Sequence, residues 1–549
     1  MNSGNFNGFA SHKLFDGLAI AALAILTALV LATFREYGIG WDGPFHAENG
    51  DWILRFLFSG GEDRTIFETK YHRFYGGAFD APVELLARFA PLAPHETRNL
   101  AAALTGILAI AGAWRLACYL GGPLVGFLTV VFLASLPSFY GHMFINPKDI
   151  PFAAGYVWTL YFMLRAAEFL PDIPFRRALP LGLSLGLTLG IRVGGIILIA
   201  YMGGLLLAHF AWLRDRSPTS RSSLSPLAPY VNALIIPMLA VLVPAYCLMI
   251  SMWPLALLNP ILGPLQGLES TLQHAWKGGV LFRGALVFSQ DLPASYLPVY
   301  FAVKLPEYML VMMAAAVPTT VLGVSQALRD GDQRQILGYA TLLLGIIFPP
   351  SYAAAAKSVH YDAIRHFIFI LPPLAILLAL EARKIAAWLS HRHSVILAAA
   401  GVLLIAGVTS AATTMVRLHP YQYTYYNALV GGMPGAARRY ESDYWAISYK
   451  EVAAKLTAFA DEDATANGIT PTPGYYAVNV CGPAASATSF LPNTFRAVAQ
   501  FEQADFYISF TRLSCDARID APVVAEITRL GARIAVAKDL RKGYSISRP

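Results

Sequence analysis

Charged residues are scarce in this sequence. Only 14% of its 549 residues are Asp, Glu, Lys or Arg, and 56% are hydrophobic, whereas soluble globular proteins are roughly 25% charged. Apolar runs of about 20 residues, long enough to cross a hydrocarbon core, recur along most of the chain. The alternating segments of about 10 residues that are typical of transmembrane barrels are absent. The composition therefore excludes a soluble protein and predicts an α-helical polytopic membrane protein.

Cysteine is scarce too, with four residues in the whole chain. Cys118 and Cys247 lie in apolar runs, where we expect them to be buried as small hydrophobic side chains. Cys481 and Cys515 share a polar carboxyl-terminal segment and can pair if that segment faces an oxidising compartment. The net charge of +7 does not indicate a nucleic-acid partner, because much of the arginine falls in short loops between apolar runs, as membrane topology requires.

The apolar runs predict about eleven transmembrane helices. The first run follows Lys13 and lacks a convincing cleavage site, so we expect it to remain as a helix. Basic loops place the amino terminus in the cytoplasm, and the long loop 35–98 and the carboxyl terminus outside the cytoplasmic membrane. The expected spans are residues 14–34, 100–120, 125–140, 151–167, 178–191, 195–212, 231–252, 308–328, 336–354, 366–380 and 395–412.

Two domains are expected. Residues 1–415 form the transmembrane bundle, including the outer loop 35–98 with short surface helices at 51–59 and 81–90. A Ser/Pro-rich linker at 217–226 separates two halves of the bundle. Residues 416–549 form a small extracytoplasmic α/β domain. In it we expect helices at 449–464 and 522–530 and strands at 475–480, 505–510 and 533–537.

Polar residues gather in clusters on the predicted outer face. One cluster surrounds Asp42 and another precedes the span at 151–167, where Asp149 lies. Two carboxylates surrounded by cations suit transfer of a group from an anionic carrier. A carboxylate accepts a proton from the attacking hydroxyl, and cations neutralise the departing phosphate. Beside the two acids, the candidate substrate- and phosphate-binding residues are Lys70, His72, Arg73, Asn146, Lys148, Arg192, Tyr361, Arg365 and His366.

Each of these residues also has a structural interpretation. Interfacial Lys and Arg side chains commonly extend toward the membrane surface, and Asp149 is well placed to cap the helix that follows it. A divalent metal is a possibility for which Glu48 and His142 are weak candidates, since no spacing matches a known ligand pattern. Arg192 lies between apolar runs, where a cation needs a partner or a cavity.

Four motifs give the chain its resemblance to a known family. They are Trp41-Asp42, Arg98-Asn99, Asn146-Pro147-Lys148-Asp149, and Arg365-His366-Phe367 before Leu371-Pro372-Pro373. On these residues the region from Leu14 to Trp445 resembles the GT-C superfamily of integral-membrane glycosyltransferases, in the branch of protein O-mannosyltransferases and lipid A aminoarabinose transferases.

The resemblance implies a polyprenyl-phosphate-linked sugar donor. It makes Asp42 the general base, Asp149 a second active-site acid and Arg365 a phosphate ligand, with Lys70, His72 and Arg73 as first-loop basic residues. Many relatives carry a second acid where Gly43 stands here, so metal dependence stays open. The tyrosine-rich region 419–445 suits carbohydrate stacking and, equally, anchoring at the membrane interface.

The predicted function is therefore an inverting glycosyltransferase. It moves a hexosyl or pentosyl group from a polyprenyl-phosphate donor to a lipid, glycan or protein acceptor at the extracytoplasmic face. The main alternative is a transporter or flippase for a lipid-linked or anionic substrate, which predicts charges near mid-span, where Arg192 is the clearest instance. A further alternative is a membrane-anchored binding module that works through its carboxyl-terminal domain.

Overall fold

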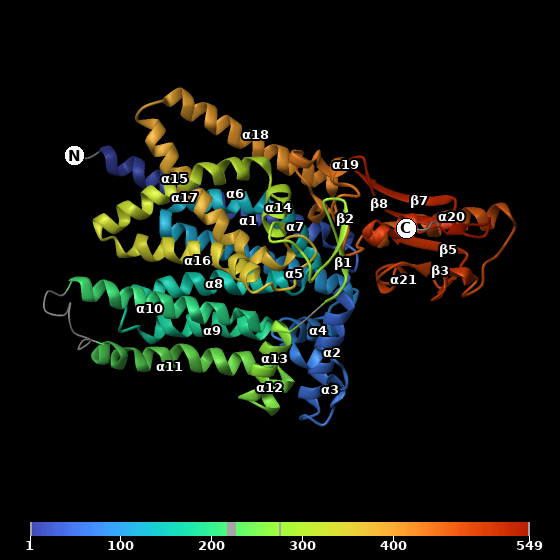
Figure 1. Ribbon diagram of the computed structural model, residues 1–549, viewed down its shortest axis with the longest axis horizontal. Coiled ribbons are helices and arrows are strands. Elements are labelled where there is room, and N and C mark those ends of the chain that lie inside the picture. Colours follow the sequence, from blue (N-terminus) through green and yellow to red (C-terminus); the bar gives the residue numbers. More distant parts are fainter. Residues whose placement is uncertain (1–2, 217–226, 274–275, 547–549) are drawn as a thin grey trace.

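Helices occupy all eleven positions expected for spans. The computed structural model describes residues 3–216, 227–273 and 276–546, so the predicted linker at 217–226 lies outside the described residues. Most of these helices run side by side along the long axis of the molecule (Figure 1). They are α1 (Ser3–Thr33), α5 (Pro94–Gly121), α6 (Pro123–Ala134) with α7 (Pro137–Ile145), α8 (Asp149–Ala167), α9 (Phe175–Ile191), α10 (Ile196–Arg216), α11 (Leu227–Ser251), α15 (Glu307–Asp330), α16 (Gln333–Ala355), α17 (Leu371–Ser390) and α18 (Ser394–Leu418).

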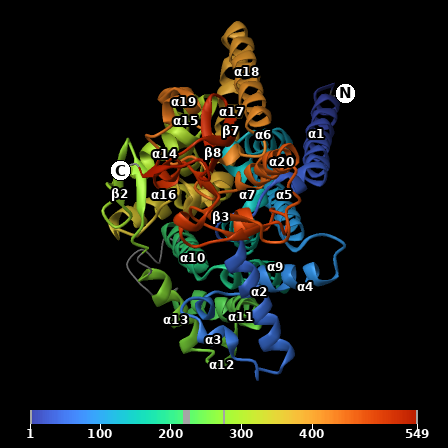
Figure 2. The same cartoon turned by 90° about the vertical axis from the view of Figure 1, so that its right-hand side faces the viewer.

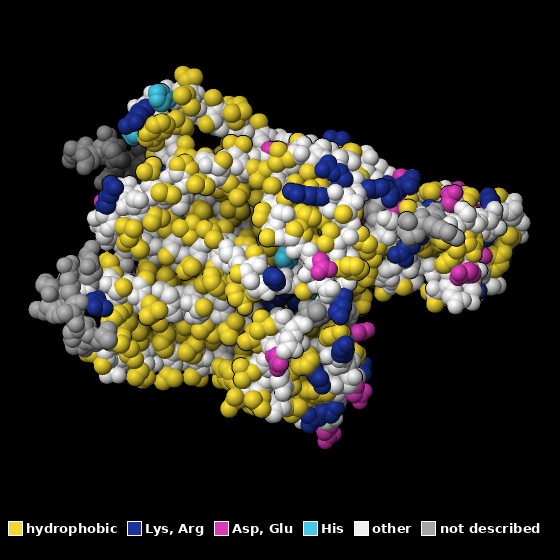
Figure 3. Space-filling model, in the orientation of Figure 1, with side chains coloured by type: hydrophobic (Ala, Val, Ile, Leu, Met, Phe, Trp, Pro, Cys, Tyr) yellow, Lys and Arg dark blue, Asp and Glu magenta, His cyan; other side chains and the backbone are white. Residues whose placement is uncertain are grey.

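Seven of the described helices are long and apolar enough to cross a membrane, and an eighth span is formed if α6 and α7 count as one. These two helices are bent by 68° at Pro137, where a new helix begins because proline fits the first turn. The other helices in the expected positions are shorter or more polar, with 19 residues in α8, 17 in α9 and three charged side chains in α17. Hydrophobic side chains cover the visible face of the bundle (Figure 3), as expected of an integral membrane protein.

Short elements cover one end of the bundle, which we call the site end. Viewed from that end, the carboxyl-terminal sheet and the short elements between α1 and α5 lie over different parts of it (Figure 2). The elements between α1 and α5 are η1 (Phe34–Glu36), α2 (Gly43–Phe58), α3 (Thr65–Glu68), η2 (His72–Phe74) and α4 (Asp80–Phe89). Those between α11 and α15 are α12 (Pro254–Leu258), α13 (Leu262–Leu272), β1 (Gly279–Phe282), β2 (Ala285–Phe288) and α14 (Tyr296–Lys304). Between spans on the same side lie η3 (Val193–Gly195) and η4 (Arg365–Ile370).

The carboxyl-terminal segment forms a five-stranded sheet in the order β4-β3-β5-β8-β7. Strand β3 runs parallel to both β4 and β5, and β8 is antiparallel to β5 and β7. The strands are β3 (Tyr476–Val480), β4 (Phe495–Ala497), β5 (Phe506–Phe510), β7 (Val523–Arg529) and β8 (Ala532–Asp539), with β6 (Ile519–Asp520) paired to β9 (Ser545–Ile546). The helical elements after α18 are η5 (Gln422–Thr424), η6 (Ala428–Val430), α19 (Gly432–Ala436), α20 (Tyr449–Ala466), α21 (Ala485–Thr488), η7 (Phe501–Gln503) and η8 (Arg512–Ala517).

One predicted helix is wrong. Residues 522–530 were expected to be helical, but they form β7, which pairs with β8. Buried Ala525 and Ile527 alternate with exposed Glu526 and Thr528. This period of two, together with several β-branched residues, favours a half-buried strand over a helix.

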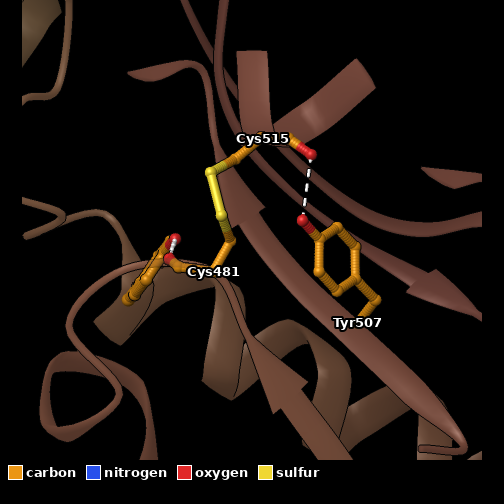
Figure 4. Close-up of a disulfide and its surroundings, with 4 residues drawn as sticks. Cys481, Tyr507 and Cys515 are labelled. Carbon is orange, nitrogen blue, oxygen red and sulfur yellow. Dashed lines mark hydrogen bonds between the residues drawn. A yellow bond between two sulfur atoms is a disulfide. The ribbon is translucent and has the colours of Figure 1, made fainter. Parts of the chain in front are cut away.

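Cys481 and Cys515 form a disulfide that joins the end of β3 to η8 (Figure 4). The Tyr507 hydroxyl on β5 donates a hydrogen bond of 3.1 Å to the carbonyl oxygen of Cys515 (Figure 4). Of the other two cysteines, Cys118 is partly buried and Cys247 is exposed, so the expected burial is wrong for Cys247. It belongs to α11 (Leu227–Ser251), a helix at the edge of the bundle (Figure 1), and its side chain is not covered by the packed core.

Candidate active site

Asp42 is positioned by the turn between the first span and α2. It directly precedes the Gly43-Pro44 start of that helix, where the fixed φ of proline suits the first turn. The Trp41 amide donates a 3.0 Å hydrogen bond to the carbonyl oxygen of Trp445. Gly40 packs against the Trp445 ring so closely that a Cβ atom at position 40 would collide with it. The loop at 35–98 is thus fixed against Trp445, about 400 positions further along the chain.

Asp42 forms an ion pair with Arg365, the first residue of η4. The distance from Arg365 Nη1 to Asp42 Oδ2 is 2.7 Å, and the Arg365 side chain is 5% exposed against 35% for Asp42. The rings of Tyr361 and Trp445 flank the guanidinium at 4.9 and 5.0 Å. Burial alone raises the pKa of Asp42, but Arg365, with smaller contributions from His46 and Lys148, brings it below its ordinary value. The carboxylate is therefore ionised at neutral pH and accessible.

Asp149 forms a second ion pair. Its Oδ1 lies 2.5 Å from Arg192 Nη1, and its Oδ2 accepts a 3.0 Å hydrogen bond from Asn146 Nδ2. Asp149 does not cap α8 but is its first residue, with Lys148 at the N-cap position, and the Asp149 amide donates a 2.8 Å hydrogen bond to Asn146 Oδ1. Arg192 therefore has the anionic partner that a cation between apolar runs requires.

The other residues near these two pairs fix their geometry. His366 Nε2 lies 3.2 Å from Arg365 Nη2, and Lys148 Nζ lies 4.2 Å from the ring centre of Tyr75. His142 is enclosed, with its Nε2 at 2.9 Å from the Tyr444 hydroxyl and its Nδ1 at 3.3 Å from Asn146. Tyr361 packs against Trp276, with ring centres 4.2 Å apart.

The predicted basic residues of the first outer loop make their contacts within that loop. His72 stacks on Phe45 with ring centres 4.0 Å apart, while Lys70 and Arg73 lie over the rings of Tyr71 and Phe74. Burial lowers the pKa of His72, so its imidazole is neutral at neutral pH. Within the described parts of the chain, no hydrogen bond or ion pair joins these three side chains to the Asp42–Arg365 or Asp149–Arg192 pair.

The described residues contain no group of three or more His, Cys, Asp or Glu placed to hold a metal ion. Of the two weak candidates, Glu48 lies with its Oε2 3.7 Å from His72 Nε2. His142 is occupied by Tyr444 and Asn146. The two candidates therefore do not converge on one site.

Asp362 and Arg512, to which the sequence assigns no role, extend the Asp42–Arg365 pair. Asp362 Oδ2 lies 3.5 Å from Arg365 Nε, and its Oδ1 lies 2.7 Å from Arg512 Nη2. The Trp445 indole also donates to Asp362 at 3.3 Å.

Arg512 in turn faces Glu441, with its Nε 3.8 Å from Glu441 Oε2, and donates to the carbonyl oxygen of Tyr444 at 2.8 Å. We call this alternating series, Asp42–Arg365–Asp362–Arg512–Glu441, the charge row. Asp362 stands three residues before Arg365, a spacing that brings side chains together in a tight turn. Arg512 carries no such signal, because it comes from the carboxyl-terminal segment.

The fold and these ion pairs define an integral membrane protein with paired carboxylates and guanidiniums at one end of a helical bundle. Residues 95–246 match the model of the dolichyl-phosphate-mannose-protein mannosyltransferase family. This match confirms, for a segment that includes Asp149 and Arg192, the resemblance to GT-C membrane glycosyltransferases. No curated protein matches the chain.

The solved structures that are similar to the chain include the following three, all at low sequence identity. ArnT from Cupriavidus metallidurans in the apo state is 14% identical, with a TM-score of 0.47 over 94% of this chain and 98% of that one. The same protein bound to undecaprenyl phosphate is 13% identical, with a TM-score of 0.47 over 96% and 98%. The oligosaccharyltransferase AglB from Archaeoglobus fulgidus is 11% identical, with a TM-score of 0.46 over 96% of this chain and 74% of that one.

Proposed function

We propose that the chain transfers one sugar from a polyprenyl-phosphate donor to an acceptor hydroxyl at the extracytoplasmic face of the membrane, with inversion at the anomeric carbon. In this proposal the amino terminus is cytoplasmic, residues 1–415 form the catalytic bundle, and residues 416–549 lie outside the membrane. The observation that carries the proposal is the Asp42–Arg365 pair, an accessible carboxylate beside a buried guanidinium at the site end.

Asp42 is the general base of the proposed reaction. It is ionised, and its side chain is 35% exposed, whereas the Asp149 side chain is 5% exposed and held by Arg192. Asp42 takes the proton of the acceptor hydroxyl as the oxygen of that hydroxyl attacks the anomeric carbon. The bond from the anomeric carbon to the phosphate oxygen breaks, and its electron pair leaves with the phosphate. One displacement of this kind inverts the anomeric centre.

Cations stabilise the departing phosphate. Arg365 pairs with Asp42 and Arg192 pairs with Asp149. The positive charge of Lys148 also contributes to the lowered pKa of Asp42. Guanidinium groups hydrogen-bond phosphate oxygens with two donors at once and are more effective in a partly dehydrated site. Because the leaving group is neutralised in this way, the reaction needs no dedicated general acid.

An apolar cavity of about 830 Å³ supports a lipid-linked donor. Side chains of α14, α15 and α16 line it, among them Phe301, Met313 and Ile347, and Lys357 and His360 also line it. His360 stands two residues before Asp362 of the charge row, so one wall of the cavity is formed by the loop that carries Asp362. A long isoprenoid chain suits such a space, since apolar surfaces bury each other.

The transporter alternative has less support. It predicts charges near mid-span, and Arg192 was the clearest instance. In the structure Arg192 follows the last residue of α9 and pairs with Asp149 at the first residue of α8. The two ion pairs therefore belong to the site end of the bundle, rather than to a path through its middle.

The test is transfer by the purified full-length chain in detergent, where no second compartment exists and transport would give no signal. The donors are a set of undecaprenyl-phosphate hexoses and pentoses, and products are identified by mass spectrometry. We expect Asp42→Asn to lower turnover by about 10²–10⁴-fold, the usual contribution of a general base, with donor binding retained. Asp51→Asn is the matched control, because Asp51 lies on α2 and pairs with Arg55 and Arg88 away from the site. Near-normal turnover by Asp42→Asn would refute the proposal.

The natural acceptor is sought by comparing glycolipids and glycans from cells with and without the protein. A species that gains one sugar only when the wild-type chain is present, and not with Asp42→Asn, identifies the acceptor as lipid, glycan or protein.

A further inference from the structure

A second cavity lies where the β1–β2 hairpin, the tyrosine-rich region and the carboxyl-terminal sheet meet, and we call it the junction cavity. Its volume is about 340 Å³, at the lower end of the range for small-molecule sites, which is about 300–1,000 Å³. Its polar and aromatic lining includes Tyr426, Tyr440, Glu441, Ser442, Thr511 and Asp516. Glycosyl transfer at Asp42 does not by itself require this cavity.

Four buried polar atoms in the lining have no hydrogen-bond partner within the described parts of the chain. They are Glu441 Oε2, Ser442 Oγ, Thr511 Oγ1 and Asp516 Oδ1. Glu441 and Asp516 are each only 2% exposed. Buried polar groups in folded proteins are nearly always hydrogen-bonded, so four such atoms around one cavity indicate a polar occupant.

The charges around the cavity are balanced in pairs. Arg512 Nε lies 3.8 Å from Glu441 Oε2, and Arg438 Nη2 lies 2.9 Å from Asp516 Oδ2. Arg533, on the same wall, is paired with Glu526, with its Nε 3.0 Å from Glu526 Oε1. A charged ligand would upset this balance, whereas a neutral group with several hydroxyls would satisfy the carboxylate and hydroxyl oxygens without adding charge.

The aromatic part of the lining fits the same kind of ligand. The rings of Tyr426 and Tyr440 lie 5.6 Å apart with an angle of 33° between their planes. Both rings line the cavity but are only 3% and 4% exposed, so they form part of an apolar wall against which the C–H groups of a sugar can pack. The combination of aromatic rings, carboxylates and hydroxyls is therefore chemically complementary to a carbohydrate.

The junction cavity is one side chain away from the proposed catalytic centre. Arg512 faces Glu441 of the cavity on one side and Asp362 on the other, and Asp362 contacts Arg365. We propose that the junction cavity binds a neutral carbohydrate group of the acceptor, remote from the hydroxyl that reacts at Asp42. This inference rests on the proposed function and assigns a glycan-bearing acceptor to it.

The test is saturation-transfer NMR on the full-length protein in nanodiscs of deuterated lipid, which reports binding without requiring transfer. The probes are methyl α-D-glucopyranoside, methyl α-D-mannopyranoside and methyl β-D-galactopyranoside. We expect saturation transfer to at least one glycoside with the wild-type chain and equally with Asp42→Asn. The signal falls at least fivefold in Thr511→Val, which removes the hydroxyl, and in Asp516→Asn, which replaces one accepting carboxylate oxygen by a donor NH2 group.

Ser509→Ala is the matched control. Ser509 lies on β5, two residues from Thr511, and its buried Oγ also lacks a partner among the described residues, but it does not line the cavity. Its signal is expected to equal that of the wild type. The inference is overturned if no glycoside receives saturation, if Thr511→Val binds as well as Ser509→Ala, or if equimolar inorganic phosphate displaces the glycosides. The proposed function fails separately, when Asp42→Asn retains transfer.

Discussion

Arg512 offers the sharpest test of whether the carboxyl-terminal segment completes the site. Its side chain is 5% exposed and lies 2.7 Å from Asp362, which is 3% exposed. Removing one partner of a buried ion pair costs about 3–5 kcal/mol, because the remaining charge is left in a poorly solvated place. Arg512→Met is therefore expected to lower the free energy of unfolding by about 3–5 kcal/mol and to abolish transfer.

Asp362→Asn tests the same pair from the other side with little change of shape. The backbone of Asp362 has a φ of +59°, a conformation that asparagine adopts more readily than most residues. The asparagine amide oxygen still accepts from Arg512, but its NH2 group cannot accept the hydrogen bond that the Trp445 indole donates to Asp362 Oδ2. A hydrogen bond to a charged group is worth about 1.5–3 kcal/mol, and we expect a cost within this range.

The double variant measures the interaction itself. In a chain that already carries Arg512→Met, Asp362→Asn lowers the free energy of unfolding by less than it does in the wild type. The sum of the two single losses is therefore expected to exceed the loss in the double variant by about 1.5–3 kcal/mol. Unfolding is followed by tryptophan fluorescence during denaturant titration of the detergent-solubilised chain. If the losses of unfolding free energy in the two single variants add up to the loss in the double variant within about 0.5 kcal/mol, as they do for distant independent sites, Asp362 and Arg512 are not energetically coupled. Full transfer by Arg512→Met would refute the role of the carboxyl-terminal segment.

Three other perturbations follow from the same geometry. Arg365→Met removes the cation that lowers the pKa of Asp42, so we expect the acidic limb of the kcat/KM–pH profile to move to higher pH. An unchanged acidic limb would contradict the assignment of Asp42 as the general base. Cys481→Ser or Cys515→Ser removes the disulfide that holds η8 and is expected to lower the free energy of unfolding by about 2–4 kcal/mol. A reductant should cause the same loss in the wild type and no further loss in the variants. Gly76→Ala places a methyl group against the backbone of Gly190 in α9, so we expect little folded protein in size-exclusion chromatography. A normal yield would contradict the close contact between Gly76 and α9.

The positions of the bundle helices along the chain were predictable because the composition of each segment alone indicates whether it can span a membrane. Apolar runs of sufficient length predicted helices at all eleven positions, whatever their neighbours. The sequence was less informative where two patterns compete. Residues 523–529 contain charges at helical spacing, which favour a helix, and β-branched residues, which favour a strand. In the structure they form a strand because they pair with β8. Tertiary contacts of this kind override local preference.

The candidate site was predictable where polar residues gather beside apolar runs. Asp42, Asp149 and Arg365 stand in or beside such clusters and Arg192 lies between apolar runs, and the structure joins these four residues into two ion pairs. Which acid meets which cation could not be read from the sequence, since the partners lie 323 and 43 positions apart. Arg512 was not predictable at all, because an arginine in a polar segment carries no signal of burial.

The resting charge row also bears on how Asp42 becomes an effective base. In the substrate-free protein Arg365 holds the Asp42 carboxylate at a low pKa, and a carboxylate with a low pKa is a weak proton acceptor. In the proposed reaction a donor phosphate competes with Asp42 for the Arg365 guanidinium. As Arg365 turns from Asp42 toward the phosphate, the lowering influence on Asp42 weakens and its pKa rises. In the proposed reaction the base is thus strengthened only when the donor is bound, while Asp362, with its Oδ2 3.5 Å from Arg365 Nε, remains a partner of the guanidinium during the exchange.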